Sequence, residues 1–162
     1  MKRLLYLFGL MSVIESKASV ITEDFLDRVA IIESNMNFDA VGDKGKSLGA
    51  YQLSEACWTD ALKWAEFNAS NDAHEWSIET LKGHWKTYAK DPTFSRFVCS
   101  SYFKLLEHRF NKKGIKPTKL QLYMAYNMGF TRAELFKFNP SSPNLPEAIY
   151  YRMRKVNLIF SK

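Results

Sequence analysis

Apolar and polar residues follow a helical period over most of the chain after residue 18. Apolar side chains that recur every three or four positions lie on one face of an α-helix and predict a buried stripe. The first such stripe follows Thr22, a good helix N-cap, and predicts a helix over residues 22–35. Further helices are expected over residues 55–67, 77–88, 92–114 and 118–129, and near the C-terminus.

Capping signals mark the ends of several of these helices. Residues typical of N-caps and first turns are Ser54, Asp91 with Pro92, Thr118 with Gln121, and Asn144 with Glu147. Gly129 is expected to end the 118–129 helix as a left-handed cap.

The helical period stops between Phe38 and Leu53. Glycines and turn-forming acids follow one another here, and a short apolar run, residues 50–53, ends the segment. This composition predicts tight turns and one small β-hairpin after the first helix. The expected fold class is therefore α+β and mostly α-helical.

Glu33 is an acid on the apolar face of the first predicted helix. It lies seven residues after Leu26 and four after Val29, and so shares their face. A carboxylate there must be paired or must open into a cleft. Burial would raise its pKa, as a general acid that protonates a glycosidic oxygen requires. Asp43 and Asp39 are candidates for a second carboxylate. The plain alternatives are a salt-bridged Glu33 and two turn-forming aspartates.

Composition sets limits on the class of protein. The 162 residues suit one domain, and 46% hydrophobic and 25% charged residues are ordinary for a globular protein. The aromatic residues, 15% of the chain, fit a core first and a carbohydrate groove second. The net charge of +6 is spread along the chain, whereas nucleic-acid binding would cluster it. We expect no nucleic-acid partner, and either a solvated surface or an anionic polymer as the reason for the charge.

Cysteines and histidines do not indicate a metal site. Cys57 and Cys99 have no metal-ligand spacing, and His74, His84 and His108 are scattered. No metal or cofactor is expected. One disulfide and two buried thiols both fit the sequence.

The N-terminus has the features of a secretory signal peptide over residues 1–18. Two basic residues precede an apolar run at 4–14, and small residues lead to a cleavage point after Ala18. The run is too short for an ordinary transmembrane helix, so no stable membrane insertion is expected after cleavage. The catalytic domain would span residues 19–162. An uncleaved anchor or a packed N-terminal helix is the alternative.

Three short motifs occur in order along the chain. They are Glu33-Ser34, then Gly49-Ala50-Tyr51-Gln52-Leu53, then Ala125-Tyr126-Asn127-Met128-Gly129. Together they resemble the lysozyme-like superfamily, in particular the Glu-Ser, Gly-x-x-Gln and Ala-Tyr-Asn-x-Gly motifs of lytic transglycosylases. The segment GDKGKSLGAYQLSEACWTDA, residues 42–61, is also similar to invertebrate-type lysozymes, with Cys57 where those have a tyrosine before Trp58.

The resemblance implies a lysozyme-like fold and roles for particular residues. Glu33 would be the catalytic acid, supported from behind by Ser34. Gln52, Tyr126 and Asn127 would line the groove. Ser47 would position a water or a sugar hydroxyl. Tyr51 would either bind substrate with these residues or belong to the core. Asp43 matches the second carboxylate of the invertebrate-type enzymes. Its turn is about one residue shorter than theirs and the family's many cysteines are missing, so hydrolysis and transglycosylation both stay open.

The expected protein is a monomeric glycosidase that acts on peptidoglycan glycan strands without a cofactor. It would cleave the β-1,4 bond between N-acetylmuramic acid and N-acetylglucosamine. It would be secreted or periplasmic, or delivered to the cell wall by a phage. Chitin is a further candidate substrate. The alternatives are a catalytically silent glycan-binding or structural module of the same shape, and a basic helical nucleic-acid protein.

Overall fold

The computed structural model describes residues 19–68 and 75–161. The predicted signal peptide, residues 1–18, lies outside the described residues. A bilayer-spanning helix, which needs about 20 apolar residues, does not occur within the described ranges.

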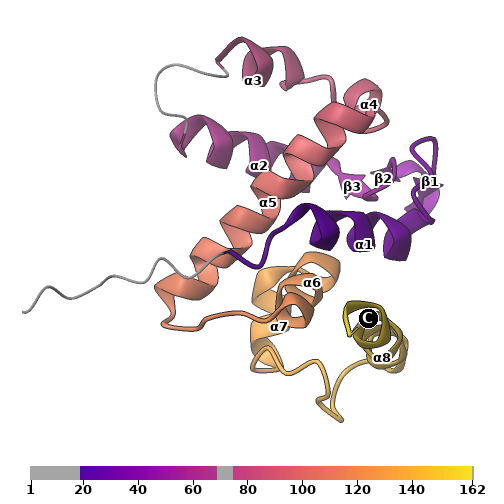
Figure 1. Cartoon of the computed structure of the whole chain (residues 1–162), viewed down its shortest axis with the longest axis vertical. Coiled ribbons are helices and arrows are strands. Elements are labelled where there is room, and N and C mark those ends of the chain that lie inside the picture. Colours follow the sequence, from indigo (N-terminus) through magenta and orange to yellow (C-terminus); the bar gives the residue numbers. More distant parts are fainter. Residues whose placement is uncertain (1–18, 69–74, 162) are drawn as a thin grey trace, which may run out of the picture.

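The described chain is mostly helical and has a small sheet directly after the first helix (Figure 1). In chain order the elements are α1 (Glu23–Ser34), β1 (Val41–Gly42), the 3₁₀ turn η1 (Asp43–Gly45), β2 (Ser47–Leu48), β3 (Leu53–Ser54), α2 (Glu55–Asn68), α3 (Glu75–Leu81), α4 (Trp85–Tyr88), α5 (Pro92–Lys112), α6 (Lys119–Met128), α7 (Phe130–Leu135) and α8 (Glu147–Phe160). The α+β, mostly helical fold class is confirmed.

Most predicted helix starts are confirmed by side-chain caps. The Thr22 hydroxyl accepts the amide of Phe25 at 3.2 Å and starts α1. Asp91 accepts two amides at the start of α5, and Thr118 and Gln121 form the expected capping box of α6. These bonds satisfy amides that have no partner inside the helix, which is why the caps can be recognised in the sequence.

Three helix predictions are wrong. The 77–88 helix is two helices, α3 and α4, because Gly83 between them has a φ of 74°. Gly129 follows the last residue of α6, but its φ of 85° and ψ of 144° lie outside the left-handed helical region, and α7, which was not predicted, begins at the next residue. Asn144 caps nothing, since α8 starts from Pro146 without a side-chain cap.

The sheet has three antiparallel strands in the order β1-β2-β3, so the single predicted hairpin is wrong in number. Leu48 in β2 pairs with Val41 on one side and with Leu53 on the other. Each strand is two residues long. Alternation of apolar and polar residues needs more positions than that, and so it could not indicate the third strand.

The 21-residue α5 runs through the centre of the fold (Figure 1). It packs against α2 on one side and against α1 and α6 on the other. Two buried indoles link the layers: Trp58 of α2 donates to the carbonyl of Leu81 at 3.1 Å, and Trp85 of α4 donates to the carbonyl of Leu53 at 2.9 Å. The second bond fixes the sheet against the junction of α4 and α5.

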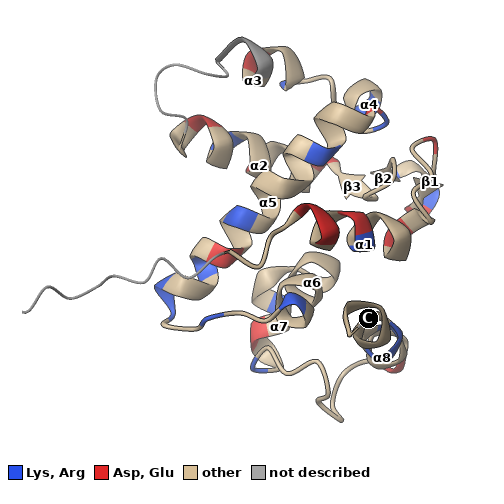
Figure 2. Cartoon of the chain, viewed as in Figure 1, with Lys and Arg blue, Asp and Glu red and all other residues tan. Residues whose placement is uncertain are grey.

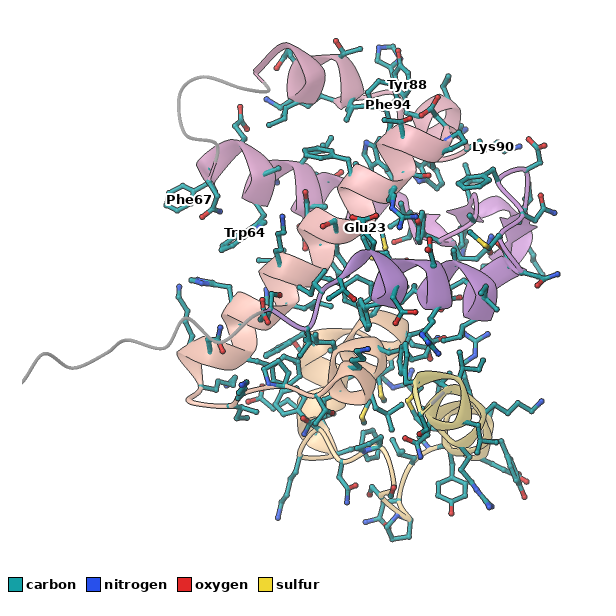
Figure 3. The ribbon with its side chains drawn as sticks, in the orientation of Figure 1. Glu23, Trp64, Phe67, Tyr88, Lys90 and Phe94 are labelled. Carbon is teal, nitrogen blue, oxygen red and sulfur yellow. The ribbon has the colours of Figure 1, made fainter. Side chains whose placement is uncertain are left out.

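An aromatic contact closes that junction. Tyr88 and Phe94 pack edge to face with ring centroids 5.0 Å apart, at the top of α5 (Figure 3).

Cys57 and Cys99 are both free thiols, the second fully buried. The structure thus has two free thiols, but the alternative of two buried thiols holds only for Cys99, since Cys57 is half-buried and lines a polar cleft.

Candidate active site

A polar cleft of about 390 Å3 brings together residues from distant parts of the chain. Its volume falls within the range of small-molecule sites. Six residues proposed from the sequence line it: Glu33, Asp43, Ser47, Gln52, Tyr126 and Asn127. The walls come from the end of α1, the turn η1, the sheet, the first turn of α2, α5, α6 and α8.

Glu33 is nearly buried, with 7% of its side chain exposed. Its Oε1 accepts a hydrogen bond from the hydroxyl of Tyr123 at 2.7 Å, and its Oε2 lies 3.6 Å from Nη1 of Arg152. Burial raises the pKa of Glu33 above the ordinary value of 4.5, against the opposing effects of Tyr123 and Arg152, and the charge of Asp43 raises it further. Glu33 can therefore hold a proton where an exposed glutamate would have lost it.

The end of α1 fixes Glu33 against the sheet. Asn35 takes the left-handed conformation that ends the helix. The Ser34 hydroxyl accepts the amide of Asn37 at 3.0 Å and donates to the carbonyl of Ala50 at 2.9 Å. Ser34 does not line the cleft. Its two hydrogen bonds join the end of α1 to the segment before β3.

Asp43 and Ser47 face the cleft from the turn and from β2. Oδ2 of Asp43 accepts the Ser47 hydroxyl at 3.1 Å. Asp43 is exposed and has a φ of 47°, which places it at the start of the turn. Asp39, the other acid of the segment, is exposed and does not line the cleft. The cleft thus holds one buried and one exposed carboxylate.

Gln52 and its neighbour Tyr51 point in different directions. Gln52 lines the cleft, and its Nε2 donates to the carbonyl of Gly49 at 2.9 Å. A Cβ on Gly42 would lie 1.9 Å from Oε1 of Gln52, so a larger residue at this position would displace the amide. Tyr51 is 1% exposed and accepts a hydrogen bond from Arg96 at 3.3 Å. Contrary to expectation, Tyr51 does not line the cleft: it lies in the turn between β2 and β3, and its ring is in the core, which was the alternative that the sequence left open.

Tyr126 and Asn127 enter the cleft from the last turns of α6. The Tyr126 hydroxyl donates to the backbone carbonyl of Tyr51. Its ring stacks on Phe103 of α5 with centroids 4.7 Å apart. These contacts hold α6 against the sheet and leave the Asn127 amide at the cleft wall.

Arg152, Tyr102 and Cys57 line the cleft and were missed in the sequence, as was Tyr123, which is buried beside Glu33 and does not line the cleft. Tyr123 contacts Glu33 directly. It lies three residues before Tyr126 on the same helix, so helical spacing could have placed both on one face. Arg152 carries no local signal, because α8 reaches the cleft only through tertiary packing. Within residues 19–68 and 75–161, no group of three His, Cys, Asp or Glu side chains is arranged to hold a metal ion.

Replacing Tyr123 with Phe is expected to raise the pKa of Glu33, because the lost phenol hydrogen bond stabilises the carboxylate. A general acid works while protonated, so the alkaline limb of the pH–rate profile should move to higher pH. NMR titration of the Glu33 carboxyl measures the shift without any turnover. Tyr102→Phe is the matched control, since it removes a different hydroxyl of the cleft. Equal titration of Glu33 in wild type and Tyr123→Phe would contradict the prediction.

Comparisons of the chain with protein-family models, with curated proteins and with solved structures gave no match, so the functional argument rests on the cleft.

Proposed function

We propose that this protein is a glycosidase that cleaves the β-1,4 bond between N-acetylmuramic acid and N-acetylglucosamine in peptidoglycan. The observation that carries the proposal is Glu33, a nearly buried carboxyl with a raised pKa at the wall of a polar cleft. Breaking a glycosidic bond requires such a proton donor. A mostly helical chain with a small antiparallel sheet directly after the helix of the acid supports a lysozyme-like fold.

In the proposed reaction, Glu33 donates its proton to the glycosidic oxygen. Oε1 accepts the Tyr123 hydroxyl, so the proton sits on Oε2. The C–O bond breaks, the leaving sugar departs as an alcohol, and the other sugar carries positive charge at its anomeric carbon. The amides of Gln52 and Asn127 offer donors and acceptors for the N-acetyl and hydroxyl groups of the two sugars.

Two routes complete the reaction. In hydrolysis, a water held by Asp43 and Ser47 attacks the anomeric carbon. In transglycosylation, the C6 hydroxyl of the muramic acid attacks, and the Glu33 carboxylate takes its proton and returns to the acid form. We favour the second route because Asp43 is exposed and one of its oxygens already accepts the Ser47 hydroxyl. The first route would need Asp43 as a base.

Digestion of purified peptidoglycan, followed by mass spectrometry of the fragments, tests the proposal. Anhydro-muramyl ends indicate transglycosylation, and reducing ends indicate hydrolysis. Intact polymer after incubation with wild-type protein would sink the enzymatic proposal. A measurable affinity for the uncut polymer would then favour a silent glycan-binding module.

Asp43→Asn distinguishes the two routes. We expect the variant to keep turnover within roughly tenfold of wild type and to produce anhydro ends, since transglycosylation needs one carboxyl. The loss of a neighbouring negative charge should also lower the pKa of Glu33 and move the alkaline limb to lower pH. A loss of more than about a hundredfold, with reducing ends from wild type, would instead assign Asp43 the second catalytic role.

A further inference from the structure

Arg152 brings a positive charge to the wall of the cleft. It extends from α8, whose outer surface carries other basic residues (Figure 2). Its side chain is 43% exposed, and Nη1 lies 3.6 Å from Oε2 of Glu33. Among the described residues Glu33 is its only ion-pair partner.

Most of the hydrogen-bonding capacity of Arg152 is available to a ligand, since besides Glu33 its side chain interacts with the Tyr123 hydroxyl. The distance of 3.6 Å to Glu33 is longer than the usual N–H···O hydrogen bond, so this contact is electrostatic. A guanidinium has five N–H donors in one plane, a geometry that matches both oxygens of a carboxylate. When Glu33 is protonated for catalysis, it is neutral. At that stage Arg152 is a partly exposed cation at the reacting bond without an anion.

We propose that Arg152 determines substrate specificity in this cleft by binding a carboxylate of the glycan next to the scissile bond. The inference rests on the proposed function and adds to it the preference for an acidic glycan over a neutral β-1,4 glycan such as chitin. In peptidoglycan the carboxylate belongs either to the peptide stem or, where the stem has been removed, to the lactyl group of the muramic acid.

Binding of the carboxylate also changes the electrostatics of Glu33. The titratable and charged groups around Glu33 are Tyr123 and Tyr126 of α6, Cys99 of α5, Arg152 of α8 and Asp43 of the turn. Arg152 is the cation in this set, and it lowers the pKa of Glu33 in the free protein. A glycan carboxylate that pairs with Arg152 cancels this effect, so the pKa of Glu33 should rise in the complex. An acidic substrate thereby helps to keep the acid protonated.

The test compares Arg152→Gln with wild type on peptidoglycan and on the same material with its carboxylates converted to amides. We expect Arg152→Gln to lower kcat/KM on the acidic polymer by roughly tenfold to a hundredfold, the range for a lost charged hydrogen bond. On the amidated polymer wild type and variant should differ by less than about threefold. Arg154→Gln is the matched control: it removes the same charge from an exposed position of the same helix outside the cleft.

The pH profile separates substrate binding from a merely structural role. The pKa seen in kcat belongs to the complex and that seen in kcat/KM to the free protein. For wild type on acidic polymer the alkaline limb of kcat should lie at higher pH than that of kcat/KM. The gap should close in Arg152→Gln and on amidated polymer. Arg152→Lys, which keeps the charge, should recover part of the loss, and thermal unfolding checks that each variant folds.

Two further measurements identify the carboxylate and keep the inference testable if no turnover is observed. Peptidoglycan with intact stems presents stem carboxylates, and strands freed of stems by an amidase present lactyl carboxylates. The substrate on which Arg152→Gln loses activity therefore identifies the carboxylate that Arg152 binds. Titration calorimetry with soluble fragments of both kinds measures binding without turnover. If wild type cleaves no polymer, the proposed function fails. The ratio of the affinities of wild type and Arg152→Gln for these fragments still decides the role of Arg152. Equal losses on acidic and amidated polymer, or unchanged affinities, would overturn this inference.

Discussion

Turnover of peptidoglycan is expected to fall by roughly 10²- to 10⁴-fold when Glu33 is replaced by Gln, the usual contribution of a general acid. Gln is almost the same size and keeps an oxygen for the Tyr123 hydroxyl, but it has no proton that can be given to the glycosidic oxygen. The loss should appear in kcat and kcat/KM alike, because the missing interaction is made only in the transition state. Release of soluble fragments, followed over time, measures it.

The same substitution should not destabilise the fold, which separates a catalytic from a structural role. Burial raises the pKa of Glu33 above its unfolded value, so the charged form is disfavoured in the native state. The stability that this group contributes is fully present below the unfolded value of 4.5 and is lost as the pH rises through the raised pKa. Glu33→Gln removes this titration. The melting temperature of Glu33→Gln minus that of wild type should therefore increase as the pH is raised from the unfolded pKa to the raised native pKa.

A surface glutamate provides the control for both measurements. Glu55→Gln changes an exposed residue in the first turn of α2 and should leave turnover unchanged. Turnover by Glu33→Gln within a few fold of wild type would refute the assignment of the general acid. A melting temperature that falls sharply in Glu33→Gln would instead show that the carboxylate is structural.

Sequence alone predicted the local features of this fold well. The caps at Thr22, Asp91 and Thr118 act on amides two or three residues away, so their partners are already in the sequence. The break at Gly83 and the absent cap at Asn144 were mispredicted, because helical spacing continues through the first and tertiary packing decides the second. The third strand was missed because each strand has only two residues, too few for an alternation of apolar and polar residues to show.

In the candidate site too, features with a local signal in the sequence were predicted and features that depend on tertiary packing were not. Glu33 could be singled out because helical periodicity put a charge on an apolar face, and the structure places it at the cleft. Tyr51 was misplaced because it lies in the turn between β2 and β3, where no alternation of apolar and polar residues indicates which side chain is buried. Arg152 had no signal at all, since only the packing of α8 against α1 and α6 brings it within reach of Glu33.

The second large effect is expected at Gly49, on the stability of the fold rather than on the reaction. Gly49 has a φ of 75°, and a Cβ added to it would lie 1.8 Å from the carbonyl oxygen of Ala89. Ala89 directly follows α4, at the junction closed by Tyr88 and Phe94 (Figure 3). The obstructing atoms are backbone, so no side-chain rotation relieves the clash and the sheet must separate from the junction.

Gly49→Ala should therefore lower the free energy of unfolding by about 2–5 kcal/mol. Left-handed backbone strain contributes roughly 1–2 kcal/mol of this, and overpacking contributes roughly 1–3 kcal/mol. For a chain of this size the melting temperature should fall by roughly 5–20 °C. Thermal and urea unfolding measure both quantities. Gly114→Ala is the control: Gly114 has a φ of 70° and nothing within 4 Å of its added Cβ, so it isolates the backbone strain.

The displacement at Gly49 should also reach the cleft. Gly49 donates its amide to the carbonyl of Ala40 at 2.9 Å, and its own carbonyl accepts the Gln52 side chain at 2.9 Å. If the strand segment moves away from Ala89, the Gln52 amide moves with it, so Gly49→Ala should weaken glycan binding even at temperatures where it is folded. Gly114→Ala should bind as wild type does. Equal destabilisation of the two variants would show that the close approach of Gly49 to Ala89 relaxes freely, and that the sheet is not held rigidly against the α4–α5 junction.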